Sequence, residues 1–162
     1  MPFADLLTAN AAYAEGFEHR DLDGRPRAGL CLLTSMDCRL DPLPMVGLQV
    51  GDAKVLRSPG GHLGPEMLAG CVLAVHALGV NRIMIIAHTR CAMAESESDL
   101  RDRISASSGI KDIDIVFGAD ADRLGRLAAD VETLRNHELI GRFAEVGGFD
   151  YDVDSGRLTQ LY

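Results

Sequence analysis

Four side chains able to form a metal or acid–base site follow two strongly apolar segments. Asp37 and Arg39 come after residues 28–34, and His88 and Cys91 come after residues 82–87. Imidazole and thiolate form a borderline-soft ligand pair that suits zinc, and the H-x-x-C spacing lets both aim at one point. The alternative is that His88 caps the following helix and Cys91 only packs, as free cysteines commonly do.

Asp37 and Arg39 form a second candidate unit. In an extended chain, residues two apart share a face, which Ser35 would also occupy. Arg39 can then orient the Asp37 carboxylate and keep it ionised by lowering its pKa. The alternative is a surface ion pair worth at most about 1 kcal/mol. The position of these residues at the end of a buried strand favours a functional role.

The glycine-rich turn that begins at Arg57 is a third candidate. Arg57 is followed by Ser-Pro-Gly-Gly, whose glycines are Gly60 and Gly61, shortly before a predicted helix. Backbone N–H groups of such a turn can approach an anionic ligand at a helix N-terminus, and Arg57 adds a positive charge. The alternative is that the glycines only satisfy a tight strand-to-helix turn.

Strands alternate with helices along the sequence. Apolar periodicity and breaker residues predict helices over 3–17, 65–78 and 95–105, a further helix capped by Asp120 or Asp122, strands over 28–34, 53–56, 82–87 and 113–117, and a hairpin over 146–161. This order predicts an α/β fold: a mostly parallel central sheet flanked by helices, with a C-terminal antiparallel hairpin and an N-terminal helical arm. Ligands of such sheets bind beyond the carboxyl ends of strands, where the three candidate segments meet.

Length and composition fit one domain spanning residues 1–162, with residues 1–20 as the arm. The net charge of −8 argues against nucleic acid or an anionic membrane as partner. No stretch reaches the roughly 20 apolar residues of a spanning helix. The four cysteines are too scattered for a disulfide scaffold, so we expect a cytoplasmic protein.

Three ordered motifs resemble the β-class carbonic anhydrases of the short bacterial type. Ser-Met-Asp-Cys-Arg-Leu begins at residue 35, Arg-Ser-Pro-Gly-Gly at residue 57 and His-Thr-Arg-Cys-Ala at residue 88. The family shows C-x-D-x-R-L, R-N-A-G-G and H-T-D-C-G in this order. The segment around residues 130–135 and the closing hairpin also look like the family.

The resemblance implies a zinc enzyme that converts carbon dioxide to bicarbonate. Its zinc would be held by the first-motif Cys, His88 and Cys91, with water or Asp37 in the fourth position. Zinc lowers the pKa of bound water to roughly 7. Asp37 and Arg39 would act as a catalytic pair that gates the fourth position, and Arg57, Gly60 and Gly61 would contact the anion. Family members are dimers or larger homo-oligomers in which the N-terminal helix wraps a partner.

This chain departs from the family at the metal. Ser35 occupies the first Cys-ligand position, and a hydroxyl is a poor substitute for a thiolate. We expect Cys38 to point to the opposite face, ~10 Å away along a strand. Arg90 and Ala92 replace the Asp and Gly of the third motif, and Arg90 should disfavour a cation.

Several functions therefore stay open. The first is carbon dioxide hydration at a weakened zinc site formed by His88, Cys91 and Asp37, with Ser35 or water as a weak ligand. The second is a metal-poor pseudoenzyme that binds bicarbonate or another small anion. The third is a hydrolase of carbonyl sulfide or carbon disulfide. The last is a structural subunit that pairs with an active homologue.

Overall fold

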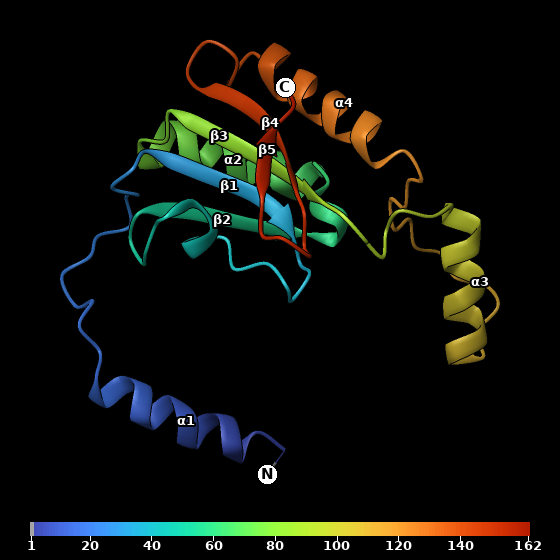
Figure 1. The fold of residues 1–162 in the computed structure, drawn as a ribbon, viewed down its shortest axis with the longest axis horizontal. Helices are drawn as coiled ribbons and strands as arrows, with labels where there is room; N and C mark the ends of the chain where they lie inside the picture. The colour runs from blue at the N-terminus through green and yellow to red at the C-terminus, as the bar shows by residue number, and fades with distance from the viewer. Residues whose placement is uncertain (1) are drawn as a thin grey trace.

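The computed structural model describes residues 2–162. Its centre is a five-stranded sheet with the strand order β2-β1-β3-β4-β5 (Figure 1). The strands are β1 (Leu30–Ser35), β2 (Ala53–Ser58), β3 (Arg82–His88), β4 (Glu145–Tyr151) and β5 (Leu158–Gln160). The first four run parallel, and β5 is antiparallel to β4. The predicted fold class, with its mostly parallel sheet and antiparallel C-terminal pair, is confirmed.

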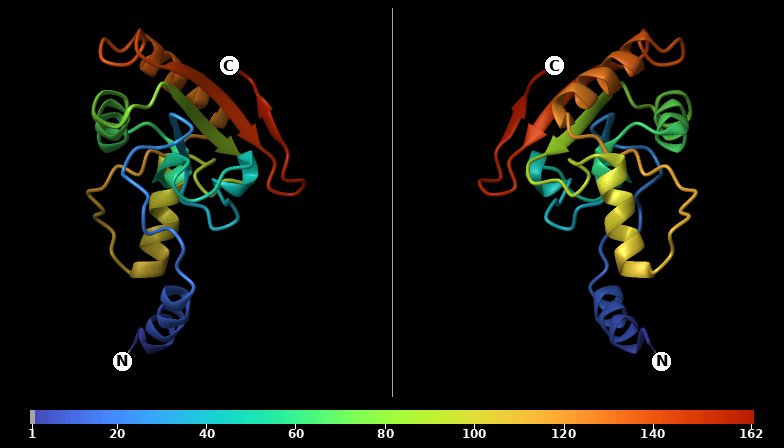
Figure 2. Two further views of the ribbon diagram at one scale, coloured as in Figure 1. Left: turned by 90° about the vertical axis from the view of Figure 1, so that its left-hand side faces the viewer. Right: turned by 90° about the vertical axis from the view of Figure 1, so that its right-hand side faces the viewer.

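Four α-helices accompany the sheet: α1 (Ala4–Glu15), α2 (Pro65–Leu78), α3 (Glu97–Ser108) and α4 (Arg123–Asn136). Short 3-10 turns occur at Pro44–Val46 and Pro59–Gly61. In the views of Figures 1 and 2, α2 and α4 lie close to the sheet, whereas α1 and α3 project away from it. None of these helices is long and apolar enough to cross a membrane within residues 2–162.

The main core lies between α2, α4 and one face of the sheet. It includes Cys31 and Leu33 of β1, Ile83 and Ile85 of β3, and Val131 of α4, all buried. These strand positions alternate, as expected when one face of a strand packs on helices. Every residue of β1 is buried, which explains the uninterrupted apolar run in its sequence.

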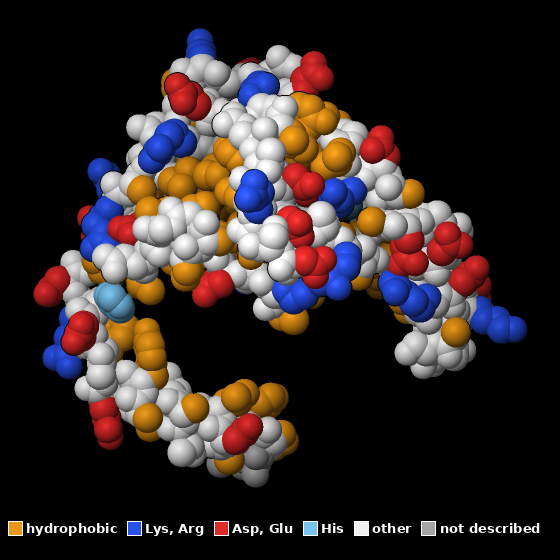
Figure 3. Space-filling view, in the orientation of Figure 1, with side chains coloured by type: hydrophobic (Ala, Val, Ile, Leu, Met, Phe, Trp, Pro, Cys, Tyr) orange, Lys and Arg blue, Asp and Glu red, His pale blue; other side chains and the backbone are white. Residues whose placement is uncertain are grey.

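The opposite face of the sheet has a thinner cover. Leu30, Leu32 and Ile86 pack there against the loop 43–48 and the C-terminal hairpin, without a helix. Apolar side chains show on the surface in this region of Figure 3. The arm helix α1 has no buried residue. Its Leu6, Leu7 and Tyr13, and Phe3 just before it, are each about 60% exposed or more.

Most predicted elements are present with small shifts. The helix over 65–78 has the predicted bounds, with Pro65 in its first turn and the left-handed Gly79 at its end. Of the two candidate caps for α4, the structure has Asp122, whose carboxylate accepts the Gly125 N–H. Strands β1, β2 and β3 run one or two residues further than predicted, so Ser35, Ser58 and His88 are their last residues.

The strand predicted over 113–117 is wrong, because this segment has no regular secondary structure. Its backbone polar groups pair with side chains of α3 instead of a neighbouring strand. Arg101 donates to the carbonyls of Ile113 and Ile115. Glu97 accepts the N–H groups of Phe117 and Ala119 at 2.8 and 3.0 Å. These bonds satisfy the backbone outside the sheet, which sequence periodicity alone does not reveal.

Candidate metal and substrate site

A cavity of about 350 Å³ lies beyond the carboxyl ends of β1 and β3. Residues of all three predicted segments line it, namely 35–39, 59–60, 88 and 91–93. The sheet register explains the meeting point: Ser35 pairs with Ser58, and Thr34 pairs with Ile86, two residues before His88. The predicted convergence of the three segments is therefore confirmed.

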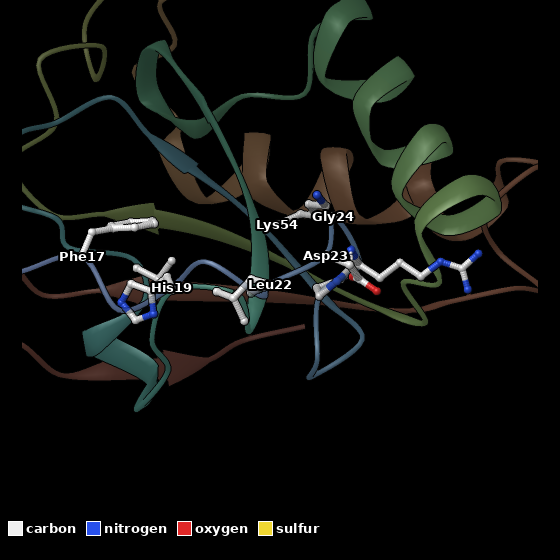
Figure 4. A pocket seen from close by; sticks show the side chains of 11 residues that line it. Phe17, His19, Leu22, Asp23, Gly24 and Lys54 are labelled. Atoms are coloured by element: carbon white, nitrogen blue, oxygen red, sulfur yellow. Dashed lines mark hydrogen bonds between the residues drawn. The ribbon is translucent and has the colours of Figure 1, made fainter. Parts of the chain in front are cut away.

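A second cavity, of about 290 Å³, lies where the N-terminal segment meets β2. Phe17, His19, Leu22 and Lys54 line it (Figure 4). It contains none of the motif residues, so the cavity beyond β1 and β3 is the one that the sequence motifs build.

Asp37 and Arg39 form a two-pronged ion pair at the cavity wall. Arg39 Nε donates to Asp37 Oδ1 at 2.9 Å, and Nη2 donates to Oδ2 at 2.7 Å. The Arg39 backbone N–H also donates to Oδ1 at 2.9 Å. These donors hold the pKa of the Asp37 carboxyl well below its usual range. The pairing is as predicted, but a turn brings the residues together, since Leu40 N donates to Asp37 O.

Arg39 also connects the first and third motifs, because its Nη2 donates to the carbonyl of Arg90 at 3.0 Å. Arg90 has a φ of 51°, the one positive φ of a non-glycine residue among residues 2–162. Its guanidinium lies 2.5 Å from Asp154 in an exposed ion pair. The Arg90 charge is thus directed at a surface carboxylate of the hairpin, which reduces the repulsion that the sequence predicted toward a cation.

Arg57 holds the first motif in place from outside the cavity lining. Its guanidinium donates to the carbonyls of Ser35, Asp37 and Leu40 at 2.8, 2.6 and 3.2 Å. Three carbonyl partners use the fork-shaped donor set of an arginine. Arg57 therefore positions the Asp37 loop, and its predicted contact with an anion stays a prediction.

Gly60 and Gly61 have φ values of 68° and 74°, which favour glycine. A Cβ on Gly61 would lie 2.9 Å from the carbonyl oxygen of Ile86, so this turn must approach the end of β3 closely. Gly60 lines the cavity. Its predicted role in anion binding stays a prediction.

His88 is 1% exposed at the end of β3. Its Nδ1 lies 2.9 Å from the carbonyl of Thr89, which can only accept, so Nδ1 carries the proton. Nε2 is buried and has no hydrogen-bond partner. It lies 3.9 Å from Asp37 Oδ2. A buried ring nitrogen without a partner is unusual and requires an explanation.

Cys91 is half-buried in the same cavity and accepts the Met93 N–H at 3.4 Å. Although burial opposes it, contact with His88 and the Met93 N–H lower the pKa of the Cys91 thiol. The same contact raises the pKa of His88 against the effect of burial. The pair thus favours the thiolate, which is the metal-binding form of cysteine.

Ser35 is buried at the end of β1, and its Oγ accepts the Asp37 N–H at 3.2 Å. Cys38 is exposed and lines the same cavity. The expectation that Cys38 faces away along a strand is wrong, because β1 ends at Ser35 and the chain turns at residues 37–40.

Two donors in this cavity, His88 and Cys91, have the chemistry that suits zinc. The unpartnered His88 Nε2 and the Cys91 sulfur are suitable donors. The 3.9 Å between Nε2 and Asp37 Oδ2 is near the ~3.4 Å that separates two ligand atoms in a tetrahedral zinc site. Ser35 supplies no thiolate. Within residues 2–162, no three His, Cys, Asp or Glu side chains are already gathered closely enough to hold a metal.

Sequence reasoning missed the apolar part of the lining, to which Met36, Pro59 and Met93 contribute. It also missed His62, whose ring lies behind Gly60. The one available signal was position, since Met36 and Pro59 lie within motifs and His62 and Met93 adjoin one.

Comparisons with known proteins show which family the chain resembles. Residues 30–115 match the family model described as carbonic anhydrase. Beta-carbonic anhydrase 1 of Mycobacterium tuberculosis (strain ATCC 25618 / H37Rv) is 24% identical over 160 residues, covering 97% of this chain and 96% of that protein. Carbon disulfide hydrolase of Acidianus sp. (strain A1-3) is 27% identical over 182 residues, covering 97% and 89%.

The crystal structure of carbonic anhydrase from Streptococcus mutans superposes with a TM-score of 0.90 at 27% identity, covering 100% of this chain and 98% of the other. The family model spans more than half of the chain and includes all three motifs. The chain therefore belongs to the β-carbonic anhydrase family.

Proposed function

We propose that this protein hydrates carbon dioxide reversibly to bicarbonate at a weakened zinc site formed by His88, Cys91 and Asp37. The observation that carries the proposal is the buried, unpartnered His88 Nε2, which faces Asp37 and Cys91 in one cavity. Membership of a family that is generally zinc-dependent supports the choice of metal.

Zinc, when bound, would lower the pKa of a water molecule to roughly 7 and so supply a nucleophile at neutral pH. The protein residues position the reactants. The Thr89 carbonyl fixes the tautomer and orientation of His88. When Asp37 is paired with Arg39 and not bound to the metal, its carboxylate stays ionised and can accept a hydrogen bond from water and orient it. Met36, Pro59 and Met93 give the cavity an apolar wall suited to carbon dioxide.

Ser35 is the reason for expecting weak zinc binding. It is buried at the position of the missing thiolate, and it is a neutral ligand whose oxygen already accepts the Asp37 N–H. Asp37 can compensate only by leaving its bidentate pair with Arg39. Both features cost metal affinity without removing the His88 and Cys91 donors.

A related small electrophile is the second candidate substrate. The Acidianus relative is a carbon disulfide hydrolase, and the sulfur atoms of Met36 and Met93 give this cavity a polarisable wall. An anion-binding pseudoenzyme has less support, because Arg39 and Arg57 already donate to Asp37 and to backbone carbonyls.

The protein is proposed to act as a homodimer or a larger homo-oligomer. The N-terminal arm exposes Phe3, Leu6, Leu7 and Tyr13, and among residues 2–162 no α-helix covers one face of the sheet. A second copy of the chain would cover both surfaces, because large exposed apolar patches on a protein commonly mark sites of association.

The test is stopped-flow carbon dioxide hydration by the full chain as free zinc is raised with a metal buffer. We expect activity that rises with zinc and saturates only at high free zinc. The variant His88→Ala should stay inactive across the range, and carbon disulfide replaces carbon dioxide in a parallel assay. The proposal fails if hydration is absent at saturating zinc, or if it proceeds equally in His88→Ala.

A further inference from the structure

Hydration of carbon dioxide produces bicarbonate and one proton, and that proton must leave the cavity. The proposed machinery offers no free acceptor for it. Asp37, His88 and Cys91 are the proposed metal ligands. Arg39 is a cation that donates to both oxygens of Asp37. A base outside these four residues is therefore needed, in an inference that rests on the proposed function.

His62 lies directly behind the cavity wall. It follows the turn that contains Gly60, and the Ser58 hydroxyl donates to its carbonyl at 2.8 Å. A Cβ placed on Gly60 would lie 2.8 Å from His62 Nε2 and 3.1 Å from Met93 Cβ. Gly60 and Met93 both line the cavity, so Nε2 lies next to its wall, at the position that a side chain on residue 60 would need.

The other ring nitrogen faces inward. Nδ1 is buried without a hydrogen-bond partner, and a Cβ on Gly118 would lie 3.7 Å from it. Burial, followed by the charge of Arg126, lowers the pKa of His62, while the carboxylates of Asp130 and Asp120 oppose that shift. His62 is thus neutral near pH 7, the form that can accept a proton.

Two carboxylates and one arginine are the charged neighbours of the His62 ring. Asp130 is buried and accepts both the Leu63 N–H at 2.9 Å and the Arg126 Nε–H at 3.1 Å. This network fixes the backbone beside His62 and places a carboxylate near the ring. For an imidazolium formed there, Asp130 and Asp120 offset part of the cost of burial and of the repulsion from Arg126.

We propose that His62 is the proton-transfer residue of this enzyme. During hydration the lone pair of Nε2 accepts the proton released in the cavity, through intervening water, and the ring becomes an imidazolium. The N–H bond at Nε2 then breaks as solvent buffer takes the proton, which restores the neutral ring. The reverse sequence supplies the proton for dehydration, so no oxidant or further reactant is needed.

Oxygen-18 exchange, measured on the zinc-loaded full chain, separates the two halves of this reaction. It reports the rate of carbon dioxide–bicarbonate interconversion and, independently, the proton-dependent rate at which labelled oxygen is released as water. We expect His62→Ala and His62→Gln to lower the release rate and kcat at least tenfold, with a much smaller change in kcat/KM. Added imidazole should restore the release rate of His62→Ala. His19→Ala, a histidine of the other cavity, is the matched control.

Two readouts exclude a merely structural role. Zinc content and the unfolding midpoint of His62→Gln should equal those of the wild type. The ring Cε1–H resonance of His62, assigned by its loss in His62→Gln, should titrate below the ordinary pH range of a histidine in the metal-free protein.

The outcomes are distinguishable. If the wild type shows no interconversion at all, the proposed function fails. If the wild type interconverts carbon dioxide and bicarbonate, two results overturn the assignment of His62. One is a release rate in both His62 variants equal to that of the wild type, and the other is a release rate that falls only together with zinc content.

Discussion

Restoring the missing thiolate is the most informative perturbation of the metal site. Ser35 is 3% exposed, ends β1 beside the strand that carries His88, and lines the cavity. A cysteine there replaces one oxygen with one sulfur and leaves the backbone unchanged. We therefore expect Ser35→Cys to fold normally and to bind zinc more tightly.

The magnitude follows from the affinity of complete sites. Structural zinc sites are worth about 10–16 kcal/mol over four ligands, so one thiolate accounts for roughly 3 kcal/mol. At 1.4 kcal/mol per factor of ten, the dissociation constant should fall roughly a hundredfold. Asp37, no longer needed as a ligand, should also keep its pair with Arg39.

The assay is competition with a chromophoric zinc chelator at fixed pH. Ser58→Cys is the matched control, since Ser58 ends β2 in register with Ser35 but does not line the cavity. The reasoning is refuted if Ser35→Cys binds zinc no more tightly than the wild type, or if Ser58→Cys gains as much.

Three further outcomes are expected. Because Arg39 lowers the Asp37 pKa in the folded state, its contribution to stability is fully present above the unfolded pKa of about 3.9 and is lost gradually as pH falls toward the much lower folded pKa. Urea unfolding should show that Arg39→Gln costs less stability at pH 2 than at pH 7. Gly61→Ala should lower the free energy of unfolding by roughly 2 kcal/mol or more. Gly47→Ala, at a nearly equal φ but with open space around the new methyl group, should lower it by about 1 kcal/mol. Equal costs would contradict the close approach of the Gly61 turn to β3. Deleting residues 2–15 should shift sedimentation toward the monomer, and an unchanged mass would exclude the arm from the interface.

The sequence predicted elements whose signals are local. The apolar run of β1 and the Pro65 and Gly79 boundaries of α2 reflect burial and backbone preferences that a short window contains. The segment 113–117 was mispredicted because Arg101 and Glu97, from a different element, satisfy its backbone. No periodicity encodes that contact.

The site was predictable in its members and less so in their roles. Asp37 and Arg39 do pair, but through a turn, and that turn also brings Cys38 to the cavity. The sequence predicts Arg57 as an anion ligand. In the structure it donates to three carbonyls of residues 35–40, and these contacts depend on how that loop folds around it. Such roles follow from backbone geometry that residue types do not specify.

The most direct test of the account is the identity of the ligands around bound zinc. X-ray absorption of the zinc-loaded wild type distinguishes sulfur at about 2.3 Å from nitrogen and oxygen at about 2.0–2.2 Å. We predict one sulfur, from Cys91, with the remaining ligands nitrogen or oxygen, and two sulfurs in Ser35→Cys. Two sulfurs in the wild type would contradict the weakened site, because Cys38 would then replace the missing thiolate.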